Sequence, residues 1–220
     1  LTDHATENKL TLFTPQSFPD LALLDGKYLK DMPHHIMVNT VVDALSHAME
    51  GMLSVKANPF TDLLAQESIR LISGCFDAMG KNILKDEERQ TLLYASALRG
   101  MVIAWTGTTM VHSMGYQLTY QRHIDHGRAN GLLLPAFLRF TQGQRPDRIA
   151  LLLSAVGVKD VDGFQKELGA VLGEKESFGH EGIVRDTKGD NSPQKAKNSI
   201  VPPTAEDIAA IYRESLPLKA

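Results

Sequence analysis

Apolar side chains recur every three or four residues along most of the chain after Pro33, and this spacing is typical of amphipathic helices. The pattern predicts helices over residues 37–54, 61–79, 86–105, 109–119, 128–141, 147–156 and 162–173. A last helix is expected after Thr204, because Asp207 follows it at the spacing of a helix-capping pair. The sequence therefore predicts a mainly α-helical fold.

Several segments depart from this pattern. Residues 10–13 and 21–25 are short apolar runs between polar residues, prolines and glycines, which is typical of strands. Residues 174–200 are rich in Gly, Lys, Glu, Asp and Asn, so we expect a mobile or irregular segment there. The polar sequence TYQRHIDHG predicts a loop after residue 119, and Pro135 predicts a kink or a break in the helix that contains it.

The composition excludes some classes of protein. The 220 residues are enough for one sizeable core, or for one domain and part of another. A formal net charge of −3 without a basic stripe argues against a nucleic-acid-binding surface. No apolar run is long enough to span a bilayer, so we expect no membrane partner. Cys75 is the only cysteine, which rules out an intrachain disulfide and favours the reducing cytoplasm.

Four residues form a candidate metal site. Asp43 and His47 are four residues apart on a predicted helix, so both side chains lie on one face. His112 and His126 flank the next predicted loop, and the second of them precedes Gly127. One carboxylate and three imidazoles are suitable ligands for Fe(II) or Zn(II). Taken singly, the pairs have a simpler interpretation, namely an Asp–His hydrogen bond on a helix and two unrelated histidines.

A metal held by these residues would support more than one reaction. It could polarise an alcohol or carbonyl oxygen during hydride transfer, but these ligands cannot accept a hydride, so that reaction needs an organic cofactor. The same ligands could equally activate a water molecule for hydrolysis. The residues alone leave both reactions open.

The strings VVDALSHAMEG, VHSMGYQ, HIDHGRANGLLLP and PPTAEDIAAIY, in this order and spacing, resemble the iron-containing (group III) alcohol dehydrogenase family. The resemblance covers residues 1–150 and about 200–215. It implies a helical metal-binding domain of the dehydroquinate synthase-like type, with a short β remnant of a nucleotide-binding domain at the N-terminus. The family's metal ligands map to Asp43, His47, His112 and His126.

The resemblance also implies a two-domain enzyme, in which a Rossmann-like domain that binds NAD or NADP precedes the helical domain. We find no glycine-rich phosphate loop in this sequence, so it matches the second domain only. Residues 1–30 are then the trailing strands and linker of the absent domain, and residues 31–220 are the metal-binding catalytic domain. We expect Fe(II), or Zn(II), as the metal, an alcohol or aldehyde as the substrate, and a homo-oligomer, as a dimer, in the cytoplasm.

Two further residues gain a role from the resemblance. Lys9 matches a family lysine near the nicotinamide cofactor, so it is a candidate cofactor-binding residue, although an exposed lysine is the simpler interpretation. Tyr116 stands one helical turn after His112, where many family members carry a second histidine near the substrate. We predict a catalytic role for it as a hydrogen-bond donor or proton relay, with a tyrosine packed on the core as the alternative.

Two alternatives to a dehydrogenase remain open at this point. One is a metal-dependent hydrolase or lyase, for which Glu50 is the obvious general base near the ligands in sequence. Otherwise, however, we interpret Glu50 as a solvated or capping carboxylate. The other alternative is an inactive metal-binding remnant that lacks its cofactor domain.

Overall fold

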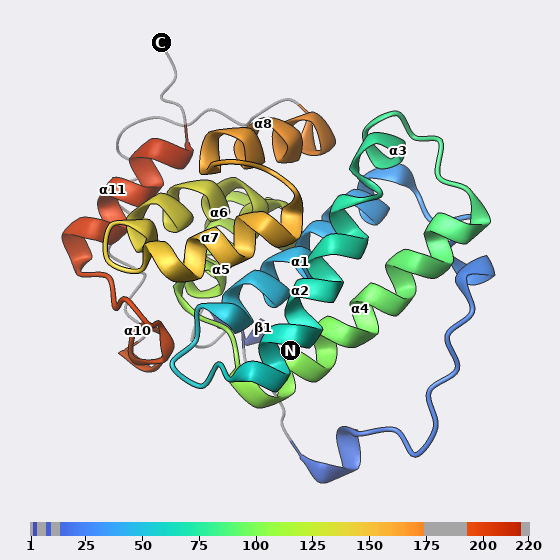
Figure 1. Ribbon diagram of the computed structural model, residues 1–220, viewed down its shortest axis with the longest axis horizontal. Coiled ribbons are helices and arrows are strands. Elements are labelled where there is room, and N and C mark those ends of the chain that lie inside the picture. The colour runs from blue at the N-terminus through green and yellow to red at the C-terminus, as the bar shows by residue number, and fades with distance from the viewer. Residues whose placement is uncertain (1, 4–7, 10–13, 174–192, 217–220) are drawn as a thin grey trace.

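The computed structural model describes residues 2–3, 8–9, 14–173 and 193–216, and this part of the chain is mainly α-helical, as predicted (Figure 1). Two short 3-10 helices, η1 (Pro15–Ser17) and η2 (Gly26–Leu29), precede the α-helices. The α-helices are α1 (His34–Met52), α2 (Pro59–Ser73), α3 (Phe76–Gly80), α4 (Asp86–Thr106), α5 (Met110–Arg122), α6 (His126–Gln142), α7 (Pro146–Val156), α8 (Val161–Leu172), α10 (Pro193–Asn198) and α11 (Ala205–Ser215).

Helix α1 lies at the centre of the molecule. It packs against α2 and α4 on one side and against α6 on the other, while α5 packs against α6 (Figure 1). The side chains of Val42, Leu45 and Met49 in α1 are completely buried. Removal of apolar surface from water is the main stabilising contribution to a helical fold. Helix α1 therefore forms the central part of the hydrophobic core, and the neighbouring helices pack against it.

The last helix begins as the sequence predicted. The Oγ1 of Thr204 accepts a hydrogen bond from the backbone N–H of Asp207 at 3.2 Å, and Oδ2 of Asp207 accepts one from the backbone N–H of Thr204 at 2.8 Å. This reciprocal capping satisfies two N–H groups that have no partner within the helix. The predicted start of α11 is therefore confirmed.

The N-terminal strands fit the prediction less well. Residues 21–25 form no strand, and the side chains of Leu21 and Leu23 are 75% and 84% exposed, so the prediction from their apolar character was wrong. The strand predicted over residues 10–13 lies outside the described residues. A two-stranded antiparallel pair is present between β1 (Thr2–Asp3) and β2 (Asn8–Lys9). That residues 1–30 trail a nucleotide-binding domain stays a prediction.

Three helix boundaries differ from the predicted ones. The helix predicted over residues 61–79 is divided into α2 and α3 at Gly74. Helix α6 continues through Pro135, so the predicted break does not occur. Helix α5 extends to Arg122, and only residues 123–125 connect it to α6, with His123 in the left-handed conformation at φ 56°.

The segment expected to be irregular is partly ordered. Residues 174–192 lie outside the described part of the chain, but residues 193–198 form α10, so the prediction was wrong there. The side-chain amide of Asn198 donates to the carbonyl oxygens of Thr106 and Thr108 at 2.9 and 3.0 Å, and Ser199 forms a β-bridge with Ser54. These contacts, two from the Asn198 side chain and one backbone bridge, fix a segment whose polar composition gave no sign of order.

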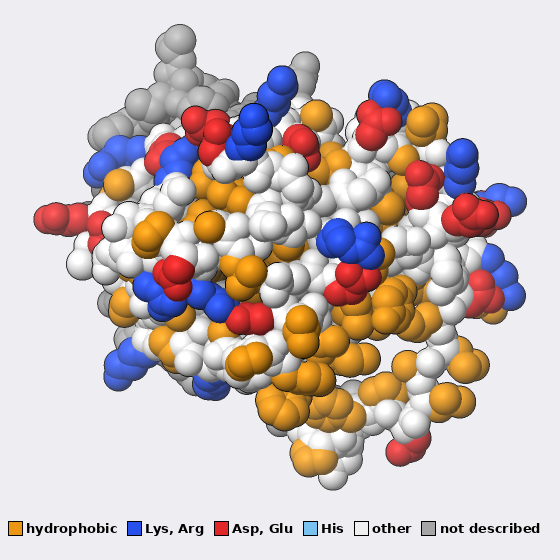
Figure 2. Space-filling view, viewed as in Figure 1, with side chains coloured by type: hydrophobic (Ala, Val, Ile, Leu, Met, Phe, Trp, Pro, Cys, Tyr) orange, Lys and Arg blue, Asp and Glu red, His pale blue; other side chains and the backbone are white. Residues whose placement is uncertain are grey.

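Hydrophobic side chains gather on the surface over α2 and α4 (Figure 2). They include Phe60 and Leu63 of α2, and Met101 and Trp105 of α4, each of which is more than half exposed. The rings of Phe60 and Trp105 are 6.0 Å apart. None of the helices described here has the length and apolar character that a membrane-spanning segment needs.

Candidate metal centre

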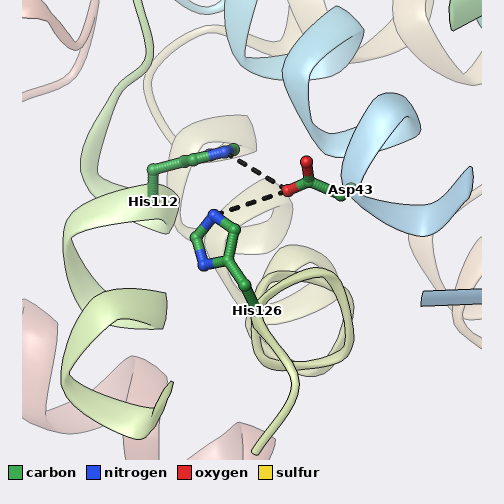
Figure 3. Close-up of side chains that lie close together, drawn as sticks. All are labelled: Asp43, His112 and His126. Carbon is green, nitrogen blue, oxygen red and sulfur yellow. Dashed lines mark ion pairs between the residues drawn. The ribbon is translucent and has the colours of Figure 1, made fainter. Parts of the chain in front are cut away.

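Three of the four predicted ligands meet where α1, α5 and α6 converge (Figure 3). Asp43 comes from the middle of α1, His112 from the first turn of α5, and His126 is the first residue of α6. The Oδ1 of Asp43 lies 3.5 Å from the Nε2 of His112 and 3.5 Å from the Nε2 of His126. One donor atom from each of the three residues lies within 4.8 Å of the others.

Glycine residues in α6 allow this convergence. A Cβ atom at Gly127 would lie 1.8 Å from the carbonyl oxygen of Asn39, and one at Gly131 would lie 2.5 Å from Cγ1 of Val42. Both distances are too short for any side chain, so only glycine lets the first turns of α6 approach α1 this closely. His126 is thereby brought beside Asp43.

The geometry and chemistry of these three residues fit a divalent transition metal. Two ligand atoms at bonds of about 2.1 Å in a tetrahedral arrangement are separated by about 3.4 Å, close to the spacing around Asp43. Burial opposes the charged form of Asp43, but the hydrogen bond from His112 and the nearby imidazoles outweigh it and lower the pKa of Asp43. Asp43 therefore remains a carboxylate, and nitrogen and oxygen donors of this kind suit iron or zinc.

Glu50 has a different place from the one predicted. It is completely buried rather than solvated, and it caps the start of α5 beneath His112, because its Oε1 also accepts from the backbone N–H of His112 at 3.3 Å. Its Oε1 accepts hydrogen bonds from the backbone N–H and the Oγ1 of Thr109 at 2.9 and 2.6 Å, and its Oε2 contacts the Nδ1 of His112. The carboxylate was misinterpreted because the sequence does not show that Thr109 and His112 pack over this face of α1.

The contact between Glu50 and His112 fixes the chemistry of the imidazole. Burial opposes the charged form of each group, but the contact lowers the pKa of Glu50 and raises the pKa of His112. Nδ1 of His112 keeps its proton because it donates that proton to the carboxylate. When the imidazole becomes neutral, the proton on Nε2 is the one that is lost, and the lone pair left on Nε2 faces Asp43. Carboxylate–histidine pairs of this kind orient metal-binding imidazoles in proteins.

His47 lies beside the three converging residues but faces another partner. Its Nδ1 is 3.4 Å from Oδ2 of Asp43 and 3.0 Å from Nη1 of Arg99, and its ring lies 4.2 Å from the ring of His112. Burial and the neighbouring His112 lower the pKa of His47 to about 3, so its ring is neutral. Since a guanidinium can only donate, Nδ1 of His47 accepts here and its proton is on Nε2.

The other predicted site residues are Tyr116 and Lys9. The structure describes the side chain of Tyr116 but only the backbone of Lys9. The ring of Tyr116 stacks on His126 at 5.1 Å and meets the edge of His112 at 6.2 Å. Burial, together with Glu50 and Asp43, raises the pKa of Tyr116 to about 12, so it stays a protonated phenol. The backbone of Lys9 lies in β2, while its side chain lies outside the described part of the structure.

Asn130 is a site residue that the sequence analysis missed. Its side-chain nitrogen lies 3.0 Å from Oδ1 of Asp43 and 3.3 Å from the Nε2 atoms of His112 and His126. The amide N–H groups and a bound cation would therefore compete for the same three atoms. The signal was present in the sequence, because Asn130 follows His126 by one helical turn and shares its face of α6.

A surface cavity gives access to the candidate centre. Its volume is about 230 Å³, which suits a small molecule, and both Asp43 and His126 border it. The complete lining consists of Ile36, Asn39, Thr40, Asp43, Asp125, His126 and Gly127. A small substrate could therefore reach the converging residues from the side where α1 meets the start of α6.

Comparisons with known proteins identify the family. The chain is 35% identical over 154 residues to the 1-propanol dehydrogenase PduQ of Salmonella typhimurium, covering 68% of this chain and 41% of that protein. It is 28% identical over 241 residues to the 1,3-propanediol dehydrogenase of Klebsiella pneumoniae, covering 98% of this chain and 60% of that protein. The chain thus spans about half the length of the curated relatives it matches.

A solved structure gives the same result. An iron-containing alcohol dehydrogenase from Thermotoga maritima superimposes with a TM-score of 0.84 at 37% identity, covering 98% of this chain and 58% of that one. Residues 37–216 match the family described as Fe-containing alcohol dehydrogenase, C-terminal. The chain therefore belongs to the Fe-containing alcohol dehydrogenase family and corresponds to its helical C-terminal domain.

Proposed function

We propose that this chain is the metal-binding catalytic domain of an NAD(P)-dependent alcohol dehydrogenase. The observation that carries the proposal is the convergence of Asp43, His112 and His126 at spacings of 3.5 Å in a chain of this family. Relatives named 1-propanol dehydrogenase and NADPH-dependent butanol dehydrogenase support an alcohol or aldehyde as the substrate. A sulfoacetaldehyde reductase of similar fold, solved with NAD+, supports a nicotinamide cofactor.

Asp43, His112 and His126 would hold the metal, for which Fe(II) is the first candidate and Zn(II) the second. His47 would join them as a fourth ligand once its ring turns away from Arg99. A divalent cation there would polarise the hydroxyl oxygen of an alcohol or the carbonyl oxygen of an aldehyde. Glu50 holds the Nδ1 proton of His112, so that Nε2 of His112 is kept available for coordination.

Tyr116 and Lys9 would act on the substrate and the cofactor. Because the pKa of Tyr116 is raised to about 12, its phenol can donate a hydrogen bond near neutral pH but cannot serve as a base. Stacking on His126 places its ring beside the centre. Lys9 would contact a ribose or phosphate group of the nicotinamide cofactor through its positive charge.

The geometry gives less support to a hydrolase or lyase. That reaction needs a general base near the metal, and Glu50 was the candidate. Glu50 is instead completely buried, and its two oxygens contact Thr109 and His112. It is therefore committed to supporting the centre rather than to activating a water molecule.

The test uses the full-length protein that contains this chain, purified without oxygen and loaded with Fe(II) or Zn(II). We expect alcohol-dependent reduction of NAD or NADP, and a higher thermal midpoint when metal is added. Asp43→Ala and His126→Ala should abolish both effects, whereas Asp162→Ala, which changes an exposed carboxylate on α8, should abolish neither. Failure of the metal-loaded protein to reduce nicotinamide, or metal-dependent turnover without nicotinamide, would contradict the proposal.

Two remaining predictions have tests of their own. Light scattering should give the mass of a homodimer, and cell fractionation should place the full-length protein in the cytoplasm. An inactive remnant would bind metal through Asp43 and His126 without any turnover, so the metal titration and the activity assay together separate it from an enzyme.

A further inference from the structure

Asp125 stands at the N-cap position of α6, immediately before His126, but its side chain is used elsewhere. Its carboxylate accepts no hydrogen bond from the backbone of α6, all of which the structure describes. Oδ2 of Asp125 instead accepts a hydrogen bond from the side-chain amide of Asn39 in α1, with a donor–acceptor distance of 2.7 Å. The carboxylate therefore joins α6 to α1 instead of stabilising the start of its own helix.

Asp160 shows the usual behaviour of an aspartate at this position of a helix. It precedes α8, and its Oδ1 accepts a hydrogen bond from the backbone N–H of Gly163 at 2.7 Å. The side chains of Asn58 and Thr204 cap α2 and α11 in the same way. A helix normally gains stability from such a bond. Its replacement at Asp125 by a contact with another helix indicates a role in how the two helices are placed.

Asn39 contacts the residues on both sides of His126. Its side chain binds Asp125, and its backbone carbonyl oxygen would be 1.8 Å from a Cβ atom at Gly127. Asn39 also lies one helical turn before Asp43 on α1, so both side chains are on the same face. These two contacts hold His126 opposite Asp43, whose Oδ1 is 3.5 Å from the Nε2 of His126.

The hydrogen bond lies at the edge of the candidate centre. Asn39 is only 9% exposed, and Asn39 and Asp125 border the same surface cavity as Asp43 and His126. A hydrogen bond from a neutral donor to a charged acceptor is stronger than one between two neutral groups. The bond is therefore suited to resist separation of α1 and α6 at the point where each helix contributes a ligand.

We propose that Asn39 and Asp125 are positioning residues, whose hydrogen bond sets the separation between His126 and Asp43 and thereby the affinity of the centre for its metal. This inference rests on the metal centre of the proposed function. Both residues act through His126 and neither is a ligand. Loss of a group that orients a metal ligand typically lowers metal affinity about 10- to 100-fold. We expect the lower end of this range, because the backbone contact of Asn39 with Gly127 remains.

The experiment titrates Co(II) into the metal-free full-length protein and follows the visible absorption bands of the bound ion, which report its coordination geometry. Asn39→Ala removes the donor without a change in charge, so the dissociation constant should rise about tenfold and the bands should shift. Asp125→Asn keeps an oxygen acceptor for Asn39 but removes the negative charge. It should therefore change the dissociation constant by less than about threefold, unless the charge itself attracts the cation.

Exchange of the two side chains separates geometry from charge. The double variant Asn39→Asp/Asp125→Asn has the net charge of the wild-type protein, and it restores a hydrogen bond in which donor and acceptor are reversed. Its dissociation constant for Co(II) should return to within about threefold of the wild-type value, with the wild-type absorption bands. A contribution that depends on the bond predicts this recovery, whereas one that depends on either residue alone does not.

Asp160→Ala is the matched control, because it also removes a carboxylate at the start of a helix. Loss of the cap should lower the thermal midpoint of the metal-free protein, while the affinity for Co(II) stays within about twofold of the wild-type value. A loss of stability of this size is thereby shown not to weaken metal binding by itself. Circular dichroism should show that Asn39→Ala is folded, and the exchange variant decides the matter if it is not.

Three results would overturn the inference. The first is a folded Asn39→Ala protein with the Co(II) affinity and absorption bands of the wild type. The second is equal weakening by Asp125→Asn and Asn39→Ala, which would assign the effect to the charge of Asp125. The third is an exchange variant that does not recover. Each of these leaves the proposed function standing, whereas a wild-type protein that binds no Co(II) would contradict the proposed function and the inference together.

Discussion

Two clusters of charged side chains in this molecule are built in opposite ways. In the Asp62–Arg148 cluster, each N–H group that contacts a partner meets a carboxylate or carbonyl oxygen, so that α2 and α7 are joined to the end of α1. In the Asp43–His112–His126 centre, one oxygen and two imidazole nitrogens face one another at 3.5 Å. The first cluster is complete within the protein, whereas the second leaves metal-binding atoms directed at one point.

The difference separates a structural from a functional arrangement. A matched ion pair such as Asp62–Arg148 stabilises helix packing and needs nothing further. Donor atoms that converge are stabilised when an ion or a proton lies between them, and buried groups around them must hold them in place. Glu50 and the close contact of Gly127 with Asn39 provide that support here.

The largest expected effect is that of Glu50→Ala. The change removes a buried carboxylate and leaves the N–H of Thr109 and the Nδ1 of His112 without an acceptor, so the free energy of unfolding should fall by about 3–5 kcal/mol. Metal affinity should fall about 10- to 100-fold. Urea denaturation and metal titration measure the two effects, and Glu50→Gln should lose less of each. Unchanged metal affinity in folded Glu50→Ala would contradict the role given to Glu50.

A second prediction concerns the contact between α1 and α6. Gly127→Ala places a methyl group 1.8 Å from the carbonyl oxygen of Asn39, so the helices must separate, at a cost of about 3 kcal/mol and with weaker metal binding. Gly169→Ala in α8 is the control, because nothing lies within 4 Å of the added Cβ, and it should stabilise the protein by about 0.5–1 kcal/mol. Equal thermal midpoints for the two variants would refute this account of the centre's geometry.

A third prediction, for Asp62→Ala, tests the Asp62–Arg148 cluster instead of the candidate centre. Loss of the partner of Arg148, in a pair that keeps some contact with water, should lower the free energy of unfolding by about 1–2 kcal/mol. Because the cluster is separate from the candidate centre, the metal dissociation constant should stay within twofold of the wild-type value. A metal affinity that falls along with stability would show that the two clusters are coupled.

The smallest effect is expected at Cys75, which is buried outside both clusters. Burial, with a contribution from Glu88, raises the pKa of its thiol to about 11, so about one molecule in a thousand carries a thiolate at pH 8. Alkylation by iodoacetamide should therefore be slow in the native protein and rise about tenfold per pH unit, because the raised pKa keeps the thiol protonated. Protection of Cys75 by added metal would place it near the metal, against this account.

The sequence predicted most of the helices because their apolar faces are wide and regular, and it predicted the start of α11 from Thr204 and Asp207. It failed over residues 21–25, where leucines are exposed rather than buried in a sheet. At Pro135, the local preference for a break was overridden by a helix whose residues on both sides of the proline are buried.

Recognition of the candidate centre from sequence was limited to residues that lie close together along the chain. Residues one turn apart, such as Asp43 and His47, could be paired from their spacing alone. The contacts of Glu50 with Thr109 and of Arg99 with His47 join separate helices, so no local pattern reveals them. Asn130 was within reach, because it lies one turn after His126, but its approach to Asp43 depends on the packing of α6 against α1.

The most direct test is anomalous diffraction at the iron absorption edge, from crystals of the full-length protein grown with Fe(II). The account predicts one strong peak bonded at about 2.0–2.3 Å to Oδ1 of Asp43 and to the Nε2 atoms of His112 and His126. A peak elsewhere in the chain, or none between these three residues in iron-loaded crystals, would contradict it.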